Sequence, residues 1–495
     1  MIQLNASTLA SVKTARGVAP KTERVIQFGE GGFLRAFCDW MIDKTNEATD
    51  MDAGVVIVQP IERGMIGMLN EQDCLYTQVL RGKVDGVPTQ DRRILQCVKR
   101  ALSPYADFEG YLALAHNKDM RIIISNTTEA GIVYTGKDSF DDKPQASFPG
   151  KLTRLLYERF TAFGGAKGTG FILLPCELID YNGKNLKECC EKTADQWNLG
   201  EAFKTWLAEE NVFCSTLVDR IVTGYPRGEA EAIWEELGYQ DNMLNTAEPF
   251  GLWVIEGPAW IEDELPFKKA GCNVVFTQDV SPYKLRKVRL LNGAHTSTVL
   301  GAYLAGFDTV GDIMKDETIR AYMTEALYNE VIPTLDLPKE DLEAFAAAVF
   351  ERFENPFIRH MLLSICLNSQ SKFRARVLPT IKEYVKRKGQ LPKILTFGMA
   401  AFIAFYCGAK KEDGSFVGVR AAGNEYPIVD DQFVLDFFAG MQGKTNAEIA
   451  HAVLTNEAFW GSDLTAELPG FEASVAASLE EIRADAKAAI AKVVG

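Results

Sequence analysis

The stretch RVIQFGEGGFLRAFCDWMIDK, residues 24–44, decides the fold. It opens with a short apolar run that ends at Gly29, as a buried strand would. Beyond the glycines, Phe33, Phe37 and Trp40 recur at helical spacing, which predicts a helix. A strand, a glycine-rich turn and a helix in this order are typical of the first unit of an α/β domain.

Three further apolar runs extend the pattern along the first half of the chain: GVVIVQP at 54–60, RIII at 121–124 and GFILLP at 170–175. Runs of this kind, separated by helical segments, indicate a parallel sheet covered by helices on both faces. After the first 276 residues strand patterns give way to long helical ones. We therefore predict an α/β chain with a Rossmann-type, doubly wound sheet domain over residues 1–276 and an all-helical domain over 277–495.

The composition is that of an acidic globular enzyme. The 495 residues include 53 lysines and arginines against 67 aspartates and glutamates, a net charge of −14. This balance argues against nucleic acid or an anionic membrane as a partner. The most apolar run, 394–408, is shorter than the roughly 20 residues that span a membrane, so we predict a buried helix there.

The chain also carries the features of a cytoplasmic protein. Its N-terminus lacks the long apolar segment of a signal peptide. The ten cysteines are scattered and include no CxxC pair, so we expect reduced thiols.

The glycine turn carries most of a dinucleotide fingerprint. Gly29 and Gly31 occupy its first two positions, and Gly32 and Phe33 follow. Glycine lets the chain approach a pyrophosphate, whose charge meets the N-terminus of the helix. A leucine replaces the third glycine, and Gln59 replaces the acid expected after the second strand. A glutamine can bind a ribose hydroxyl without repelling a 2′-phosphate, so NAD and NADP both remain open, as does a tight turn without a cofactor.

Polar residues follow two more of the predicted strands. Ser125, Thr128 and Glu129 come after RIII, and the segment CELIDYNG at 176–183 comes after FILLP. Open α/β sheets bind ligands at the carboxyl ends of their strands, so we expect both segments at the dinucleotide edge. The alternative is that they only form turns and caps.

The run KVRLLNGAHTS places Lys287, Asn292 and His295 on one predicted helix. At about 100° per residue, Asn292 lies about 140° and His295 about 80° around the helix from Lys287. An amine, an amide and an imidazole then share a polar face. The amine can take and return a proton while the other two hold a substrate oxygen. The alternative is a solvated basic stripe, because three more cations lie within 284–289.

Together these segments resemble the mannitol dehydrogenase-like family of polyol-specific long-chain dehydrogenases. GEGGFLRAF is similar to the family's GxGxFxRAH turn, with Phe37 in place of the histidine. STLVDRI at 215–221 matches the core of the family signature, although Thr223 stands where proline or serine is usual. The run KVRLLNGAH matches the family's K-x4-N-x2-H helix residue for residue.

The resemblance implies an oxidoreductase that transfers a hydride directly between NAD and a sugar or sugar acid, without a metal. It implies that Lys287 is the general acid and base. Asn292 and Asn182 are then donors to the reacting oxygen, and His295 positions that oxygen. The four histidines show none of the spacings typical of a zinc site.

A sugar acid brings a carboxylate, which calls for a cation, ideally a bidentate arginine. Lys372 and Arg374 in SKFRARVLP lie beside a segment that contributes substrate contacts in the family, and His360 is a further candidate. Asp219 in VDRI either faces the lysine or nicotinamide or only anchors the neighbouring arginine. A polyol substrate remains open, and so does a different class of protein, a non-catalytic dinucleotide-binding redox sensor. The sequence gives no oligomeric state.

Overall fold

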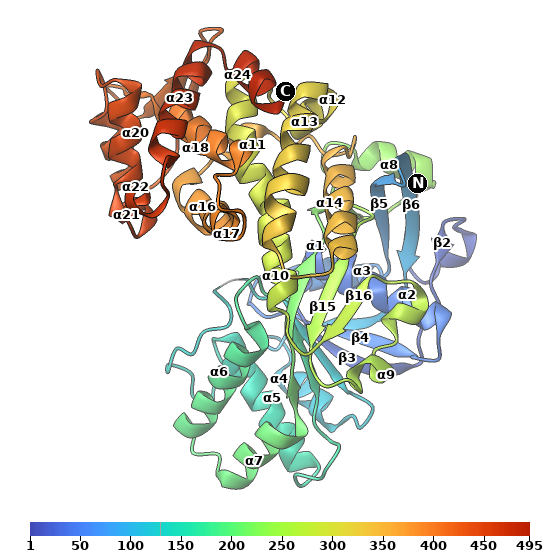
Figure 1. The fold of residues 1–495 in the computed structure, drawn as a ribbon. Helices are drawn as coiled ribbons and strands as arrows, with labels where there is room; N and C mark the ends of the chain where they lie inside the picture. The colour runs from blue at the N-terminus through green and yellow to red at the C-terminus, as the bar shows by residue number, and fades with distance from the viewer. Residues whose placement is uncertain (129) are drawn as a thin grey trace. The chain divides into compact units, whose positions relative to one another are not determined.

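The computed structural model describes residues 1–128 and 130–495, which divide into two compact units (Figure 1). The first unit comprises Met1–Gly82 and Thr89–Val280. The second comprises Ser281–Gly495 together with Lys83–Pro88. The first unit extends slightly beyond the predicted boundary because β16 (Val274–Thr277) completes one of its sheets.

The main sheet of the first unit has six strands, and every neighbouring pair is parallel. Its order is β10-β9-β8-β3-β4-β7, which is the doubly wound order 3-2-1-4-5-6 read from the other edge. The order in which the strands are added reverses between β3 and β8, and such sheets bind their ligands at this point. The strands are β3 (Thr22–Phe28), β4 (Ala53–Val58), β7 (Val98–Leu102), β8 (Ile122–Ser125), β9 (Ile172–Pro175) and β10 (Val212–Phe213).

Alternate residues of these strands face two separate cores, as the period of two in a strand requires. Val25 faces a core built with the helix that follows the glycine turn, whereas Ile26 faces a core built with α5, α6 and α7. Helices therefore cover both faces, which confirms the predicted doubly wound domain. The helices are α1 (Gly32–Leu34), η2 (Arg35–Asp39), α2 (Trp40–Ala48), α5 (Phe148–Ala162), α6 (Asn182–Gln196) and α7 (Glu201–Glu210).

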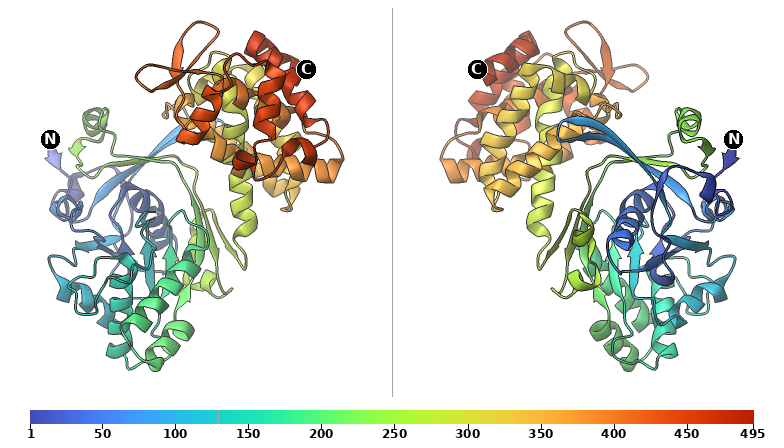
Figure 2. Two further views of the ribbon diagram at one scale, coloured as in Figure 1. Left: turned by 90° about the vertical axis from the view of Figure 1, so that its left-hand side faces the viewer. Right: turned by 90° about the vertical axis from the view of Figure 1, so that its right-hand side faces the viewer.

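Two of the further sheets in the first unit are not evident from the sequence. A five-stranded sheet has the order β12-β14-β5-β6-β2, and a three-stranded sheet has the order β11-β15-β16. Strands β5 and β6 are long (blue in Figure 2), and the turn between them, Lys83–Pro88, belongs to the second unit. The strands are β2 (Ala15–Arg16), β5 (Tyr76–Val84), β6 (Val87–Leu95), β11 (Ser215–Asp219), β12 (Val222–Gly224), β14 (Asn245–Ala247) and β15 (Leu252–Glu256).

The second unit is built on helices around α18 (Lys393–Tyr406), which is buried along almost its whole length. This confirms the predicted buried helix, and no helix within the described ranges is long and apolar enough to cross a membrane. The prediction that this half lacks strands is wrong at β17 (Ala409–Lys410), β18 (Phe416–Val419) and β19 (Glu425–Pro427), a small antiparallel sheet. The main helices are α10 (Ser281–Arg286), η5 (Lys287–Asn292), α11 (Gly293–Leu304), α12 (Val310–Lys315), α13 (Glu317–Glu325), α14 (Lys339–Phe353), α16 (Ser369–Arg376), α17 (Leu378–Lys388), α20 (Asn446–Leu454), α23 (Phe471–Ala484) and α24 (Ala486–Val494).

The helix after the glycine turn contains a buried acid. Asp39 lies in η2, a π-helical segment, and its side chain is fully buried. One oxygen, Oδ2, accepts hydrogen bonds from the Tyr76 hydroxyl at 2.7 Å and from Gln27 Nε2 at 3.4 Å. Burial raises the pKa of Asp39 to about 7, so the folded protein holds this carboxyl protonated in mildly acidic solution.

We predict that Asp39→Asn becomes progressively more stable relative to the parent as the pH rises from 4 to 7. Over this range the unfolded parent ionises at position 39 while the folded parent does not. Each pH unit therefore costs the parent up to about 1.4 kcal/mol that the variant does not lose. Above pH 7 both states of the parent are ionised, and the difference should stay constant. Urea unfolding of both proteins from pH 4 to 9 measures this, and a difference independent of pH would contradict it.

Candidate active site

The first glycine of the turn adopts a conformation that other residues avoid. Gly29 has φ +129°, and its N–H donates to Val58 O at 3.1 Å. A Cβ at Gly29 would lie 3.0 Å from Leu34 Cδ1. The leucine that replaces the third glycine of the fingerprint is therefore accommodated because it packs over the first one.

The next two glycines leave the backbone at the N-terminus of the helix without side chains. Gly31 is the N-cap of α1 and is exposed, with no atom within 4 Å of its Cβ position. Gly32 is held by Asn245, whose Nδ2 donates to Gly32 O at 2.8 Å. Phe33 stacks on Phe37 at 5.2 Å between ring centroids and is a packing residue. The bare backbone at the N-terminus of a helix that continues through η2 and α2 fits a pyrophosphate.

Gln59 lies at the end of β4, as predicted, and is buried. Its Nε2 donates to Ile61 O at 2.9 Å and to Glu62 O at 3.0 Å. Its Oε1 is buried and has no hydrogen-bond partner among the described residues. An unsatisfied buried acceptor at the strand end where a dinucleotide places its ribose fits that group as well.

The segments after β8 and β9 are joined by a carboxylate that the sequence did not single out. Glu177 accepts from Ser125 Oγ at 3.1 Å and from Thr127 N and Oγ1, both at 2.9 Å. Burial raises the pKa of Glu177. Ser125 thus holds the strand ends together, whereas Thr128 is exposed with φ +77°. Glu129 lies outside the described residues.

Asn182 lies at the start of α6, where its side-chain amide forms hydrogen bonds with backbone groups. Nδ2 donates to Pro175 O at 2.9 Å and to Glu177 O and Thr216 O, both at 3.1 Å. Oδ1 accepts from Gly183 N at 2.9 Å and Thr216 N at 2.8 Å. Because both ends of the amide are satisfied, this geometry argues against the predicted donation to a reacting oxygen. Asn182 instead joins the end of β9 to β11.

The VDRI segment forms the end of β11. Asp219 is buried and pairs with Leu252 of β15 in the sheet register. Arg220 donates from Nη1 to Ala36 O at 2.7 Å, from Nε to Phe250 O at 2.9 Å and from Nη2 to Pro249 O at 3.0 Å. Ala36 lies in the π-helical segment η2, where an i→i+5 pattern frees carbonyl groups from the α-helical ladder. Arg220 therefore anchors the helix of the glycine turn.

The helix carrying Lys287, Asn292 and His295 is not a continuous α-helix. Lys287–Asn292 is a π-helical segment between α10 and α11. With an i→i+5 pattern, Asn292 takes the place over Lys287 that an i+4 residue takes in an α-helix, so the two lie about 40° apart rather than about 140°. His295 follows three residues later on the same face. All three are partly exposed, whereas Leu290 and Leu291 are buried.

His295 is surrounded by aromatic rings and cations. Its ring centroid lies 4.1 Å from that of Phe353 and 5.5 Å from that of His360. Its Nδ1 is buried, and the part of the chain that the structure describes gives it no hydrogen-bond partner. Burial lowers the pKa of His295 to about 3, and His360, Arg352, Arg376 and Lys372 act in the same direction. The imidazole is therefore neutral at physiological pH, with one donor and one acceptor nitrogen.

Two of these cations lie on one face of α16. Lys372 and Arg376 are four residues apart, so they are neighbours on the helix. Lys372 Nζ donates to Ile365 O at 3.0 Å, and Arg376 Nη1 lies 3.5 Å from Thr296 Oγ1. Within the described ranges neither forms an ion pair with a carboxylate, and burial lowers the pKa of both. The Asp430 carboxylate acts on Lys372 electrostatically, but it accepts hydrogen bonds from Tyr406 Oη and Gln370 N.

The structure does not bring Arg374 to this cluster. It lies two residues from Lys372, on the other side of α16, and is exposed. Its Nη2 lies 3.0 Å from the Cβ position of Gly461. Arg376, which the sequence analysis did not single out, takes the place expected for Arg374. The i, i+4 spacing from Lys372 was the signal that could have identified it.

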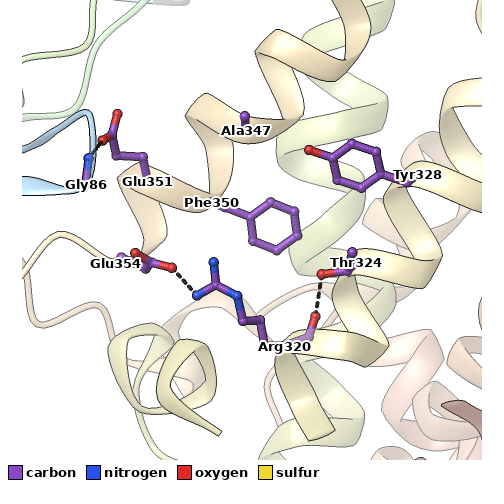
Figure 3. A pocket seen from close by; sticks show the side chains of 8 residues that line it. All are labelled: Gly86, Arg320, Thr324, Tyr328, Ala347, Phe350, Glu351 and Glu354. Carbon is purple, nitrogen blue, oxygen red and sulfur yellow. Dashed lines mark hydrogen bonds and ion pairs between the residues drawn. The ribbon is translucent and has the colours of Figure 1, made fainter. Parts of the chain in front are cut away.

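A separate pocket in the second unit has a volume of about 490 Å³ (Figure 3). Two of its charged groups, Arg320 and Glu354, form an ion pair. Glu354 pairs with Lys83 at 2.6 Å and with Arg320, and Glu351 accepts from Gly86 N at 2.7 Å. The charge of Glu354 is therefore compensated by two cations, whereas Glu351 is bound only by a backbone N–H. In the part of the chain that the structure describes, no three His, Cys, Asp or Glu side chains gather closely enough to hold a metal ion.

Comparison with known proteins places this geometry in a family. The model of the mannitol dehydrogenase Rossmann domain matches residues 23–269, and that of the mannitol dehydrogenase C-terminal domain matches residues 279–483. An altronate oxidoreductase of Pectobacterium carotovorum subsp. carotovorum (strain PC1) is 50% identical over 467 residues, which are 93% of this chain and 94% of the relative. An altronate oxidoreductase of Escherichia coli O139:H28 (strain E24377A / ETEC) is 49% identical with the same coverage.

Two solved structures share the fold. D-sorbitol dehydrogenase in substrate-free form matches with a TM-score of 0.80 at 22% identity, over 99% of this chain and 100% of the other. Pseudomonas fluorescens mannitol 2-dehydrogenase, in a ternary complex with NAD and D-mannitol, matches with a TM-score of 0.67 at 23% identity, over 99% of each chain. The resemblance inferred from the sequence motifs is thus confirmed, and the chain belongs to the mannitol dehydrogenase family.

Proposed function

We propose that this chain catalyses the reversible, NAD-dependent reduction of D-tagaturonate to D-altronate in hexuronate breakdown, with a lysine as general acid and base and without a metal. Its family makes it an oxidoreductase that acts on CH–OH groups, and relatives named altronate oxidoreductase cover nearly its full length. One observation of the structure carries the choice of a sugar acid. Lys372 and Arg376 lie beside a neutral His295 and are not matched by a carboxylate of the described chain.

A half-buried positive charge without a partner is unfavourable, and two neighbouring ones repel each other as well. A substrate carboxylate removes both penalties. Arg376 can bind it in a bidentate manner, and Lys372 adds a second charge at the same helix face. A neutral polyol would leave the two cations uncompensated. His360 is partly buried, and its ring lies 5.5 Å from that of His295, so we assign it a packing role against His295.

The proton is handled by Lys287. When bound at the glycine turn, the dinucleotide supplies the hydride from its nicotinamide ring. In the reducing direction the Lys287 ammonium gives a proton to the substrate oxygen as that oxygen gains charge, and in the oxidising direction the amine removes it. The Asn292 side chain, brought over Lys287 by the π-helical segment, donates a hydrogen bond to the same oxygen. The neutral His295 orients it without adding a charge that would compete for the proton.

The near alternatives keep this mechanism and change the substrate to fructuronate or mannitol. The alternative from another class is a redox sensor that binds the dinucleotide without turnover. Incubation of the protein with NADH and a panel of ketouronates and ketoses, followed by absorbance of the nicotinamide, separates them. We expect tagaturonate to be reduced fastest. Faster reduction of fructuronate or fructose would reassign the substrate, and no oxidation of NADH would favour the sensor.

We also propose a cytoplasmic location. All ten cysteines are free thiols in the structure, and all but Cys407 are buried. Buried free thiols are typical of proteins in a reducing compartment.

Lys287→Ala should lower kcat for tagaturonate by about 10³-fold, because proton transfer in the transition state is lost. The dissociation constant of NADH, measured by fluorescence, should stay within about twofold, because the lysine handles the substrate and not the cofactor. Small amines in solution should restore part of the rate, in the order of their basicity. Lys315→Ala, an exposed lysine at the end of α12, is the control and should keep full activity. Normal turnover in Lys287→Ala would refute the assignment.

Arg376→Met should reduce the preference for a sugar acid, measured as kcat/KM for tagaturonate divided by kcat/KM for the neutral ketose tagatose. A hydrogen-bonded pair with a charged group is worth roughly 1.5–3 kcal/mol, so we expect this ratio to fall about 10- to 100-fold, chiefly through KM for tagaturonate. Arg374→Met removes the same charge from the other side of α16 and should leave the ratio unchanged. Equal losses in the two variants would contradict the proposed carboxylate site.

A further inference from the structure

Two acceptor oxygens converge at the end of β4, where the described chain supplies few donors for them. Gln59 Oε1 is buried and unpartnered. The identity of this end of the amide is fixed, because the other end faces two carbonyl oxygens, Ile61 O and Glu62 O, and must therefore be the NH₂ group. An acceptor buried without a donor is unfavourable unless a ligand supplies one.

The second acceptor is Glu30, the residue between the first two glycines of the turn. Its side chain is buried, and from the described residues Oε1 accepts only a long hydrogen bond, 3.3 Å, from Met65 N. A Cβ at Gly64 would collide with both Glu30 Oε1 and Gln59 Oε1. The two oxygens therefore lie against the same point of bare backbone, and only a glycine at position 64 lets the loop approach them so closely.

We infer that Glu30 and Gln59 together bind the 2′- and 3′-hydroxyls of the adenosine ribose, and that the Glu30 carboxylate selects NAD over NADP. This rests on the proposed function only in taking a nicotinamide dinucleotide as the cofactor. A vicinal diol supplies two donors to the two acceptors. The carboxylate strengthens one of these hydrogen bonds and repels a 2′-phosphate by its charge.

This assignment also accounts for the departure of the chain from the dinucleotide fingerprint. The fingerprint places an acid after the second strand to bind the ribose, and this chain has Gln59 there. The glycine turn supplies the missing carboxylate from the first strand instead. A glutamine is then the suitable neighbour, because a second carboxylate beside Glu30 would add repulsion between like charges.

One feature of the same loop favours the opposite cofactor. Arg63 is exposed and forms no ion pair within the described ranges. An arginine near this strand end can bind a 2′-phosphate. The experiment must therefore weigh Glu30 against Arg63.

The test measures binding without substrate, at pH 8, by titration calorimetry with NADH, NADPH, ADP and 2′-deoxy-ADP. The parent should bind NADH at least about tenfold more tightly than NADPH, and ADP more tightly than 2′-deoxy-ADP. Glu30→Gln removes the charge but keeps an oxygen that can accept from Met65 N. It should shift the NADH to NADPH affinity ratio by about 10- to 100-fold toward NADPH and reduce the effect of the 2′-hydroxyl. Glu62→Gln, an exposed acid in the same loop, is the matched control and should leave both ratios unchanged.

An unchanged ratio in folded Glu30→Gln would overturn the inference, and so would equal binding of ADP and 2′-deoxy-ADP by the parent. Preference of the parent for NADPH, lost in Arg63→Ala, would assign the site to Arg63 and overturn it as well. Discrimination between ADP and 2′-deoxy-ADP without turnover of any sugar would support the inference while the proposed function fails. Binding of none of the four nucleotides would overturn both.

Discussion

A positive charge that is taken out of water needs an anion beside it, and in the helical unit the described chain does not supply one to Lys372 or Arg376. The energetic reason is direct, since a partly buried cation without a partner loses hydration and gains nothing in return. Burial keeps His295 neutral, and the positive charges of Lys372 and Arg376 act in the same direction. The polar face of this unit is therefore suited to an anionic ligand that also presents an oxygen to a neutral imidazole and an amide. A sugar acid has both features, and a polyol has only the second.

A second constraint is shared by the two units. Each unit contains a π-helical segment. In the first unit η2 follows the glycine turn, and in the second unit η5 begins at Lys287. The irregular hydrogen bonding has a different use in each. In η2 the carbonyl of Ala36 is bound by Arg220, which fixes the helix that starts at the dinucleotide turn. In η5 the longer turn brings Asn292 over Lys287, so that an amine and an amide lie on the same side of the helix.

Periodicity and turn chemistry were sufficient to predict the doubly wound sheet and the buried helix α18, but they did not predict the π-helical segment at Lys287. The same reasoning missed β5 and β6, because polar residues interrupt the apolar pattern of these strands. It did not predict the hydrogen bonds of Asn182, since only coordinates show that both ends of its amide bind backbone groups. The sequence could have favoured Arg376 over Arg374, because a residue four positions after Lys372 lies on the same face of a helix. Glu30 could not be found from the sequence, since its convergence with Gln59 depends on how the loop at Gly64 folds over the turn.

The most direct measurement is a crystal structure of the protein with NAD and D-altronate. The substrate carboxylate is expected within hydrogen-bonding distance of Arg376 and Lys372, with the oxidisable hydroxyl within hydrogen-bonding distance of Lys287 Nζ and the Asn292 amide. A carboxylate bound elsewhere, with Lys372 and Arg376 facing only water, would contradict the account of the helical unit and leave its cations unexplained.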